Sequence, residues 1–364
     1  MTNQIIGQRR LGSLLVSGLR QQKPEQVVKE LGAMQAQDYM QVVWAIGLRT
    51  GAGTLSDIQA AILDRKIVLT WALRGTIHCV PAEDVKWMTQ LVASRILGSA
   101  KRRLEQLGLD DETLTRSRKI IYDALKGHRQ VTRPSLMQQL EDAGIRTDNQ
   151  RGYHILWSSA YQGLICFGPM SGKQQTFVLV DEWVPNAREQ SFEESMAELA
   201  LRYFKSHGPS TLQDFAWWTG TTLTDSRRAL DAVKDKLQFE IIAGTDYWFS
   251  EAQPYQANEH EEDICLLSGF DEFILGYKDR SAVLSPEIAP RIVPGNNGIF
   301  LPTLVAGGKV VGTWKRNIKK KGIEISIHPF ESIDGKEEGL QHAVERFASF
   351  LEMPILKLEI NASF

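Results

Sequence analysis

The sequence predicts an α+β protein with three tandem winged-helix domains and a small C-terminal β-barrel, or a curled sheet covered by a helix. Helical segments followed by a β-hairpin, the order found in a winged helix, recur three times before residue 254. From residue 254 onward, segments rich in β-forming residues replace the helices. The predicted domains are residues 1–107, 108–185, 186–253 and 254–364.

The first predicted domain begins with helices. Apolar residues at helical spacing predict a helix over residues 5–20, and Pro24 opens a second helix at a position that proline tolerates. Asp38 and Gln41 have the spacing of a capping box, which predicts Asp38 as the N-cap of a third helix ending near Arg49. The rest of the domain is predicted as a helix, a hairpin and a long helix, over residues 55–66, 67–80 and 81–106.

The second and third predicted domains repeat this order with little sequence similarity to the first. Helices are predicted over residues 114–126, 131–143, 153–162, 195–208, 210–220 and 222–236, and hairpins over residues 164–180 and 237–250. The hairpins turn at Ser171-Gly172 and at Gly244. The last domain is predicted as strands over residues 265–277, 298–316 and 322–330, with a final helix carrying Leu340, Val344, Phe347 and Leu351 on one side.

Composition places the chain among soluble globular proteins. It has 364 residues, of which 43% are hydrophobic and 24% charged. It contains no apolar run of transmembrane length and no signal-peptide pattern. Cys79, Cys166 and Cys265 are isolated in apolar surroundings, which fits buried, reduced thiols. We therefore expect a cytoplasmic protein without a membrane partner.

Charge is unevenly distributed, although the net charge is only −2. Residues 95–133 carry twice as many basic as acidic residues, whereas residues 251–272 are acidic and contain no Lys or Arg. A local basic face matters more for contact with phosphate than net charge does. The span 95–133 is therefore compatible with nucleic-acid contact and equally with ordinary solvated helix faces.

Common motifs for cofactor and metal chemistry are missing from the sequence. It has no Walker A loop, Rossmann fingerprint, GxSxG elbow, HExxH motif or paired Cys/His zinc spacing. None of the 7 histidines stands at metal-ligand spacing from another ligand type. We therefore expect no cofactor and no metal. Winged helices, which dock against nucleic acid, are then the leading clue to function.

The tripeptide Gln35-Ala36-Gln37 lies between two predicted helices, just before Asp38. Turns of this kind normally use Gly, Asn, Asp or Ser. The pair falls where free backbone N–H groups and the positive end of the third helix are also expected. Carboxamides that converge there could hold a water or a polar ligand, and a plain polar turn is the alternative.

Four segments together resemble the winged-helix DNA glycosylases of the AlkZ/YcaQ type. They are LGAMQAQDYMQVVWAIGLR, TWALRGTIHCVPAEDVKWM, FDEFILGYKDRS and VPGNNGIFLPTLVAGGKVVGTWKR, and the resemblance spans nearly the whole chain. It implies a C-shaped arrangement of tandem winged helices and a β-barrel around damaged double-stranded DNA. It also implies excision of N7-alkylated purines, unhooking of interstrand crosslinks, and no cofactor. The family's catalytic motif is Gln, an apolar residue, then Gln or Asp, and it falls on Gln35, Ala36 and Gln37.

The two-glutamine version of the motif limits the chemistry. Glutamine is neither an acid nor a base near neutral pH, but it can orient a water through its carbonyl oxygen and amide donors. A purine alkylated at N7 is positively charged and already a good leaving group, and carbonyl dipoles can stabilise the charge that develops on deoxyribose. We therefore expect Gln35 and Gln37 to position a water against C1′ of the damaged nucleotide, in an open cleft.

Other side chains are candidates for contact with DNA. Arg74 lies at the tip of the first hairpin and His78 in its second strand, where a purely structural role is the alternative for His78. At least one of the adjacent Trp217 and Trp218 is expected in the core. The densest basic run follows Trp314 at the end of a predicted strand, where a loop could meet the DNA backbone or a turn could simply improve solubility. This run comprises Lys315, Arg316, Lys319, Lys320 and Lys321.

Two non-catalytic functions are alternatives to the glycosylase. A winged-helix transcriptional regulator would usually be a symmetric dimer, whereas the sequence has no heptad zipper, and three winged helices in one chain favour a monomer. A protein-interaction scaffold would leave the basic span 95–133 without a role, and salt-dependent DNA binding would argue against it.

Overall fold

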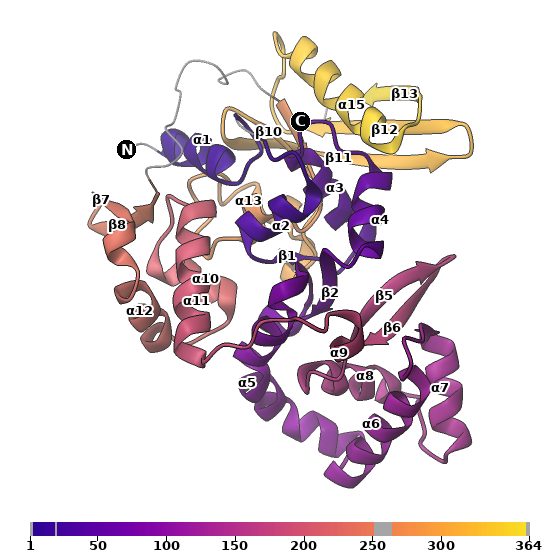
Figure 1. The fold of residues 1–364 in the computed structure, drawn as a ribbon. Coiled ribbons are helices and arrows are strands. Elements are labelled where there is room, and N and C mark those ends of the chain that lie inside the picture. The colour runs from indigo at the N-terminus through magenta and orange to yellow at the C-terminus, as the bar shows by residue number, and fades with distance from the viewer. Residues whose placement is uncertain (1–2, 19, 251–263, 362–364) are drawn as a thin grey trace. The chain divides into compact units, whose positions relative to one another are not determined.

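The computed structural model describes residues 3–18, 20–250 and 264–361 (Figure 1). The described chain has a mixed α+β fold and forms two compact units. One comprises residues 1–60 and 197–364, and we call it the discontinuous unit. The other, the continuous unit, comprises residues 61–196. Of the acidic span predicted at 251–272, residues 251–263 lie outside the described residues.

The discontinuous unit begins with helices close to the predicted positions. Pro24 opens α2, and Asp38 caps α3 as predicted, because its side chain accepts a hydrogen bond from Gln41 N at 3.3 Å. The first helix ends earlier than predicted because Leu15 takes a positive φ of 61°. The elements are α1 (Asn3–Ser13), α2 (Pro24–Leu31), β1 (Met34–Gln35), α3 (Tyr39–Arg49) and α4 (Leu55–Leu63), the last of which runs on into the continuous unit.

The predicted order of helices and a hairpin is also present in residues 186–253. Thr211 and Asp214 form a capping box at the start of α11, and Gly244 makes the hairpin turn with a φ of 79°. The elements are α10 (Phe192–Ser206), α11 (Leu212–Thr219), α12 (Leu223–Asp231), β7 (Gln238–Ile242) and β8 (Thr245–Phe249). The number of winged-helix domains and their boundaries stay predictions.

The continuous unit contains a sheet in the order β3-β2-β5-β6-β4. The predicted hairpins at 67–80 and 164–180 are both present, and Leu69 of the first pairs with Phe167 of the second, which joins them into one sheet. Its strands are β2 (Ile67–Trp71), β3 (Ile77–Pro81), β4 (Val131–Thr132), β5 (Ile165–Ser171) and β6 (Gln174–Leu179). Its helices are α5 (Val85–Gln106), α6 (Asp111–Leu125), α7 (Arg133–Asp142), α8 (Arg151–Tyr161) and α9 (Val180–Trp183).

The C-terminal strands form an open sheet rather than the predicted barrel. Their order is β13-β12-β11-β10-β9, so β13 and β9 are edges within the described part of the chain. The sheet does not close because β13, which follows α15, returns parallel to β12 instead of pairing with β9. The elements are β9 (Ile264–Leu267), α13 (Glu272–Leu275), α14 (Ala289–Ile292), β10 (Thr303–Ala306), β11 (Lys309–Lys319), β12 (Gly322–Pro329), α15 (Glu337–Leu351) and β13 (Ile355–Ile360).

A helix covers this sheet, as predicted. Phe347 of α15 packs between two tryptophans, with ring centroids 4.9 Å from Trp44 and 5.0 Å from Trp314. Trp44 belongs to α3 and Trp314 to β11, so one aromatic cluster joins the N-terminal helices to the C-terminal sheet. The core of the discontinuous unit is therefore built from both ends of the chain.

Residues 265–277, predicted as a strand, change to a helical turn halfway. The strand ends at Leu267. Phe270 then takes a positive φ of 58°, and the side chain of Asp271 accepts a hydrogen bond from Phe273 N at 3.0 Å, which caps α13. Apolar residues fill both halves of the segment, so hydrophobic alternation alone cannot separate them.

Two smaller predictions about buried residues are confirmed. Cys79, Cys166 and Cys265 are buried free thiols, and burial raises the pKa of Cys79 to about 12. Trp218 is fully buried, whereas Trp217 is partly exposed.

In the described part of the chain, no helix is both long enough and apolar enough to cross a membrane.

Candidate active site

The glutamine pair lies at the start of α3. Gln35 is the last residue of β1 and is only 9% exposed, whereas Gln37 is exposed. Asp38 follows as the N-cap, so the first turn of α3 begins directly after the pair. One carboxamide thus belongs to a buried residue, and the other belongs to a residue that reaches solvent.

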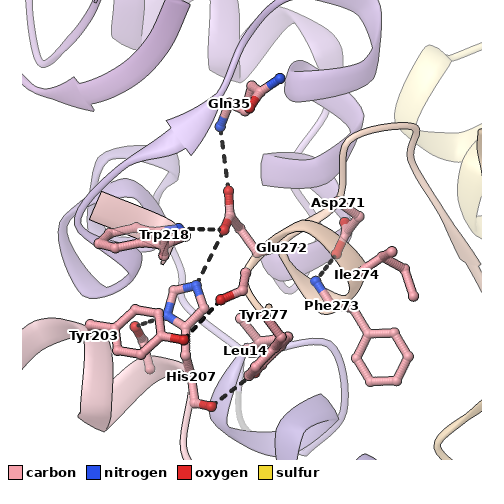
Figure 2. Close-up of polar contacts among 12 residues, drawn as sticks. Leu14, Gln35, Tyr203, His207, Trp218, Asp271, Glu272, Phe273, Ile274 and Tyr277 are labelled. Carbon is pink, nitrogen blue, oxygen red and sulfur yellow. Dashed lines mark hydrogen bonds and ion pairs between the residues drawn. The ribbon is translucent and has the colours of Figure 1, made fainter. Parts of the chain in front are cut away.

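Glu272 binds the main chain of Gln35. Its Oε1 accepts a hydrogen bond from Gln35 N at 3.4 Å, and its Oε2 accepts one from Nε1 of Trp218 at 2.8 Å (Figure 2). Nε2 of His207 lies 3.3 Å from the same Oε2. Glu272 is only 2% exposed. Three nitrogens from distant parts of the sequence therefore converge on one buried carboxylate.

His207 is held between Ser206 and Glu272. Its Nδ1 lies 2.8 Å from Oγ of Ser206, and its ring stacks on Tyr203 with the centroids 4.5 Å apart. Burial lowers the pKa of His207, and the hydrogen bond to Glu272 opposes that shift. The hydroxyl of Ser206 donates to the carbonyl oxygen of Arg202 at 2.8 Å, so its oxygen acts as an acceptor towards Nδ1 of His207. Glu272 accepts hydrogen bonds from Gln35 N and from Nε1 of Trp218.

Asp271 forms a buried ion pair with Arg49, the last residue of α3. Two guanidinium nitrogens donate to its carboxylate oxygens at 2.9 and 2.8 Å, and the side chains of Arg49 and Asp271 are 0% and 1% exposed. Arg49 also donates to the carbonyl oxygens of Leu14 and Ala45, each at 2.8 Å. The pair is bidentate and well supplied with hydrogen bonds, and it fixes the C-terminal end of α3 beside α13.

Gln41, in the first turn of α3, is hydrogen-bonded to two residues that lie far from it in the sequence. Its Oε1 accepts hydrogen bonds from Gly269 N at 2.7 Å and from Nη1 of Arg316 at 3.3 Å. Burial lowers the pKa of Arg316, and the negative charge of Asp38 opposes that shift. Arg316 therefore places its guanidinium group at the N-terminal end of α3, close to the glutamine pair.

This arrangement is suited to hydrolysis without a protein base. The motif supplies two neutral carboxamides, and the neighbouring Asp38 uses its side chain to cap α3. Such groups can orient a water and stabilise developing positive charge through their dipoles. Among the described residues, no group of three or more His, Cys, Asp or Glu side chains could hold a metal ion.

Comparison with known proteins shows which protein family the chain belongs to. The model of the family described as DNA glycosylase AlkZ-like matches residues 28–350. The chain belongs to this family. The enzyme is 25% identical over 324 residues to the interstrand DNA cross-link repair glycosylase of Streptomyces sahachiroi, which covers 79% of this chain and 81% of that relative. Its fold is similar to the solved structure of Streptomyces sahachiroi DNA glycosylase AlkZ, with a TM-score of 0.83, 22% identity, and coverage of 99% of this chain and 100% of that chain.

Family membership confirms the resemblance found in the sequence. The enzyme is a DNA glycosylase, a hydrolase of N-glycosyl bonds, and its substrate is DNA. The regulator and scaffold alternatives are therefore set aside. The structural likeness, at 22% identity, supports the fold. The roles of individual residues depend on the geometry described above.

The basic run of the enzyme lies in a strand rather than in the predicted loop. β11 continues through Lys319, and only Lys320 and Lys321 fall in the turn to β12. Alternation along the strand places Lys315 and Lys319 on one face and Arg316 on the other. The lysines are exposed, whereas Arg316 is partly buried against α3. The run is thus divided between a solvent-facing surface and a contact with the first turn of α3.

The two hairpin candidates of the enzyme differ in exposure. Arg74 is partly exposed in the turn between β2 and β3, with a positive φ of 55°. His78 is fully buried, and its Nδ1 lies 3.0 Å from the carbonyl oxygen of Thr76. Burial favours a structural role for His78. Contact of either residue with DNA stays a prediction.

Sequence reasoning missed the part played by Glu272. The residue was interpreted only as the end of an acidic span, within a segment predicted as a strand. A signal was nevertheless present, because Asp271 and Glu272 interrupt an apolar segment and buried charges require partners. Arg49, at the end of an apolar helix, is the matching signal for Asp271.

Proposed function

We propose that this enzyme hydrolyses the N-glycosidic bond of cationic N7-alkylated purines in double-stranded DNA, with Gln35 and Gln37 positioning the attacking water. The observation that carries the proposal is the placement of two uncharged carboxamides at the start of α3, followed by an aspartate whose side chain caps the helix. A motif without a side chain that titrates near neutral pH favours a substrate that is activated before it binds.

Alkylation at N7 supplies that activation. The alkylated base takes the electron pair of the bond between C1′ and N9 and leaves as a neutral molecule, and positive charge develops on the deoxyribose. The carboxamide oxygens stabilise this charge and orient a water whose oxygen bonds to C1′. One proton of that water is released to solvent, and an abasic sugar remains.

The proposal extends to interstrand crosslinks joined through purine N7 atoms. The Streptomyces sahachiroi relative is named a cross-link repair glycosylase. A purine tethered to the opposite strand carries the same positive charge and leaves by the same step, but it cannot rotate into a closed pocket as an unlinked base does. Unhooking requires that the water and both carboxamides reach C1′ of the deoxyribose while its base stays tethered to the opposite strand.

The proposal is tested by comparing one cationic with one neutral lesion. We expect the enzyme to release N7-methylguanine from a duplex and to leave hypoxanthine and unmodified guanine in place, because only the first is already charged. Abasic sites are revealed as strand breaks after alkali, with an enzyme-free sample correcting for spontaneous loss. A crosslinked duplex on a denaturing gel tests unhooking. Equal excision of hypoxanthine, or no excision of N7-methylguanine, would contradict the proposal.

The exposed lysines of β11 and its turn are the proposed contacts with the DNA backbone, together with Arg74. Lys315 and Lys319 share a strand face, and Lys320 follows at the turn. Lys319 Nζ lies 3.5 Å from Glu324, with both side chains partly exposed, so solvent screens this pair and it can exchange for a phosphate. Arg316 is left out of this surface because its guanidinium group binds Gln41.

A double Lys315→Ala, Lys319→Ala variant tests this surface. We expect the plot of log K against log salt concentration for DNA binding to be less steep in the variant than in the parent. The magnitude of its negative slope should be smaller by about 2, because each neutralised phosphate contributes roughly 0.9 to it. Fluorescence anisotropy with an undamaged duplex at several salt concentrations measures the slope. Lys205→Ala removes an exposed lysine of α10 and serves as the control, with no expected change. An unchanged slope in the double variant would remove these lysines from the interface.

A further inference from the structure

A short segment contacts the glutamine motif and the helix that follows it at three points. We call residues 268–272, between β9 and the first residue of α13, the clamp segment. The contacting pairs are Glu272 with Gln35, Gly269 with Gln41, and Asp271 with Arg49. The three partners lie in the motif, in the first turn of α3 and at the end of α3. The clamp segment therefore contacts the glutamine motif and both ends of α3.

Close approach of backbone to side chain is required at the second of these points, between Gly269 and Gln41. Gly269 donates its N–H to Gln41 at 2.7 Å. A Cβ at position 269 would lie 2.8 Å from the carbonyl oxygen of Phe300 and 3.3 Å from Cδ of Gln41. Glycine is therefore needed where the clamp segment passes the carbonyl oxygen of Phe300, and a Cβ there would also crowd the side chain of Gln41.

The surroundings of Glu272 are arranged to hold a carboxylate. Trp218 and His207 both face Oε2, which leaves Oε1 directed at Gln35 N (Figure 2). Gly276 makes room for this arrangement, because a Cβ there would lie 2.7 Å from Cδ2 of His207. A buried carboxylate loses its hydration, which costs free energy. A protein with an apolar side chain of similar volume at the same place is therefore often equally stable or more stable. The observed cluster instead specifies one position for the main chain of Gln35.

We propose that Glu272 is a positioning residue for base excision: its carboxylate fixes the main chain of Gln35 and thereby the geometry with which Gln35 and Gln37 hold water. The inference rests on the proposed function of the glutamine pair. Glu272 acts through Gln35 and does not itself meet the substrate. Displacement of reacting groups by about 1 Å can cost roughly 100-fold in rate, so loss of this anchor is expected to affect catalysis far more than DNA binding.

The test is the Glu272→Gln variant, which keeps the shape of the side chain and removes its charge. At saturating enzyme, we expect the single-turnover rate of N7-methylguanine excision to fall about 10- to 100-fold, while the Kd for the lesion duplex stays within about twofold. Glu338→Gln is the matched control, because it makes the same substitution at an exposed residue of α15. Its rate is expected to stay within about threefold of the parent.

A second readout does not depend on activity. In protein labelled with ¹⁵N-glutamine, the backbone amide signal of Gln35 is expected to shift and exchange faster in Glu272→Gln but to keep its position in Glu338→Gln. An unmoved Gln35 signal, or equal loss of rate in both variants, would overturn the inference. If the signal moves but the parent excises no N7-methylguanine, the proposed substrate fails and the anchoring of Gln35 stands. Should Glu272→Gln not fold, Glu272→Asp, which keeps the charge and withdraws it by one methylene, takes its place with the same expected outcomes.

Discussion

The Gln37→Ala variant is expected to fold as the parent does and to lose roughly 10²- to 10³-fold in the single-turnover rate of N7-methylguanine excision, the range measured for removal of one preorganised polar group. Gln37 is exposed, so truncation of its side chain removes little buried surface and leaves stability almost unchanged. The loss arises because the attacking water no longer has one of its two carboxamide partners. Rates at saturating enzyme, with Kd measured separately, separate this effect from weaker DNA binding.

Gln37→Asp is the informative comparison for this prediction. The motif implied by the sequence resemblance has either Gln or Asp at this place, so we expect the Asp variant to keep most of the rate. An aspartate with an ordinary pKa of about 3.9 would add a decline in rate as the pH falls below about 4, which the parent lacks. A Gln37→Ala enzyme with the full parental rate would show that this carboxamide does not hold the water, and would return Gln37 to the plain polar turn.

Local signals in the sequence were sufficient to place α3 and the motif in front of it. The spacing of Asp38 and Gln41 predicted the N-cap, and the hydrogen bond between them confirms it. The hairpin at 67–80 and the burial of at least one of Trp217 and Trp218 were predicted on the same basis, and Trp218 is the buried one. Each of these features is decided by residues within a few positions of one another, so the chain's own pattern contains the information.

Features that depend on distant contacts could not be predicted in this way. Glu272 meets Gln35 across 237 positions of sequence, and no spacing rule connects them. The segment around Glu272 was predicted as a strand because apolar residues surround it, although Asp271 caps a helical turn there. The barrel was wrong for a similar reason, since only the parallel pairing of β13 with β12 shows that the sheet stays open.

Asp271→Ala is expected to lower the free energy of unfolding by about 3–5 kcal/mol, the usual cost of removing one partner from a buried ion pair. The change leaves the guanidinium group of Arg49 buried without the carboxylate that it binds through two hydrogen bonds. It also removes the side-chain cap of α13, which adds to the loss. Urea unfolding followed by tryptophan fluorescence measures the effect, because Trp44, Trp218 and Trp314 all lie in the discontinuous unit.

The double variant Arg49→Met, Asp271→Leu separates the contribution of the ion pair to stability from its contribution to excision activity. Apolar residues of similar volume often replace a buried ion pair at no cost in stability, so we expect the double variant to regain most of what Asp271→Ala loses. Arg49 ends α3 and Asp271 precedes Glu272, so the pair also helps to hold the anchor of Gln35 in place. Stability recovered without excision activity would show that the ion pair serves the alignment of the glutamine motif. A double variant no more stable than Asp271→Ala would instead show that the hydrogen bonds of Arg49 to Leu14 and Ala45 hold this part of the fold together.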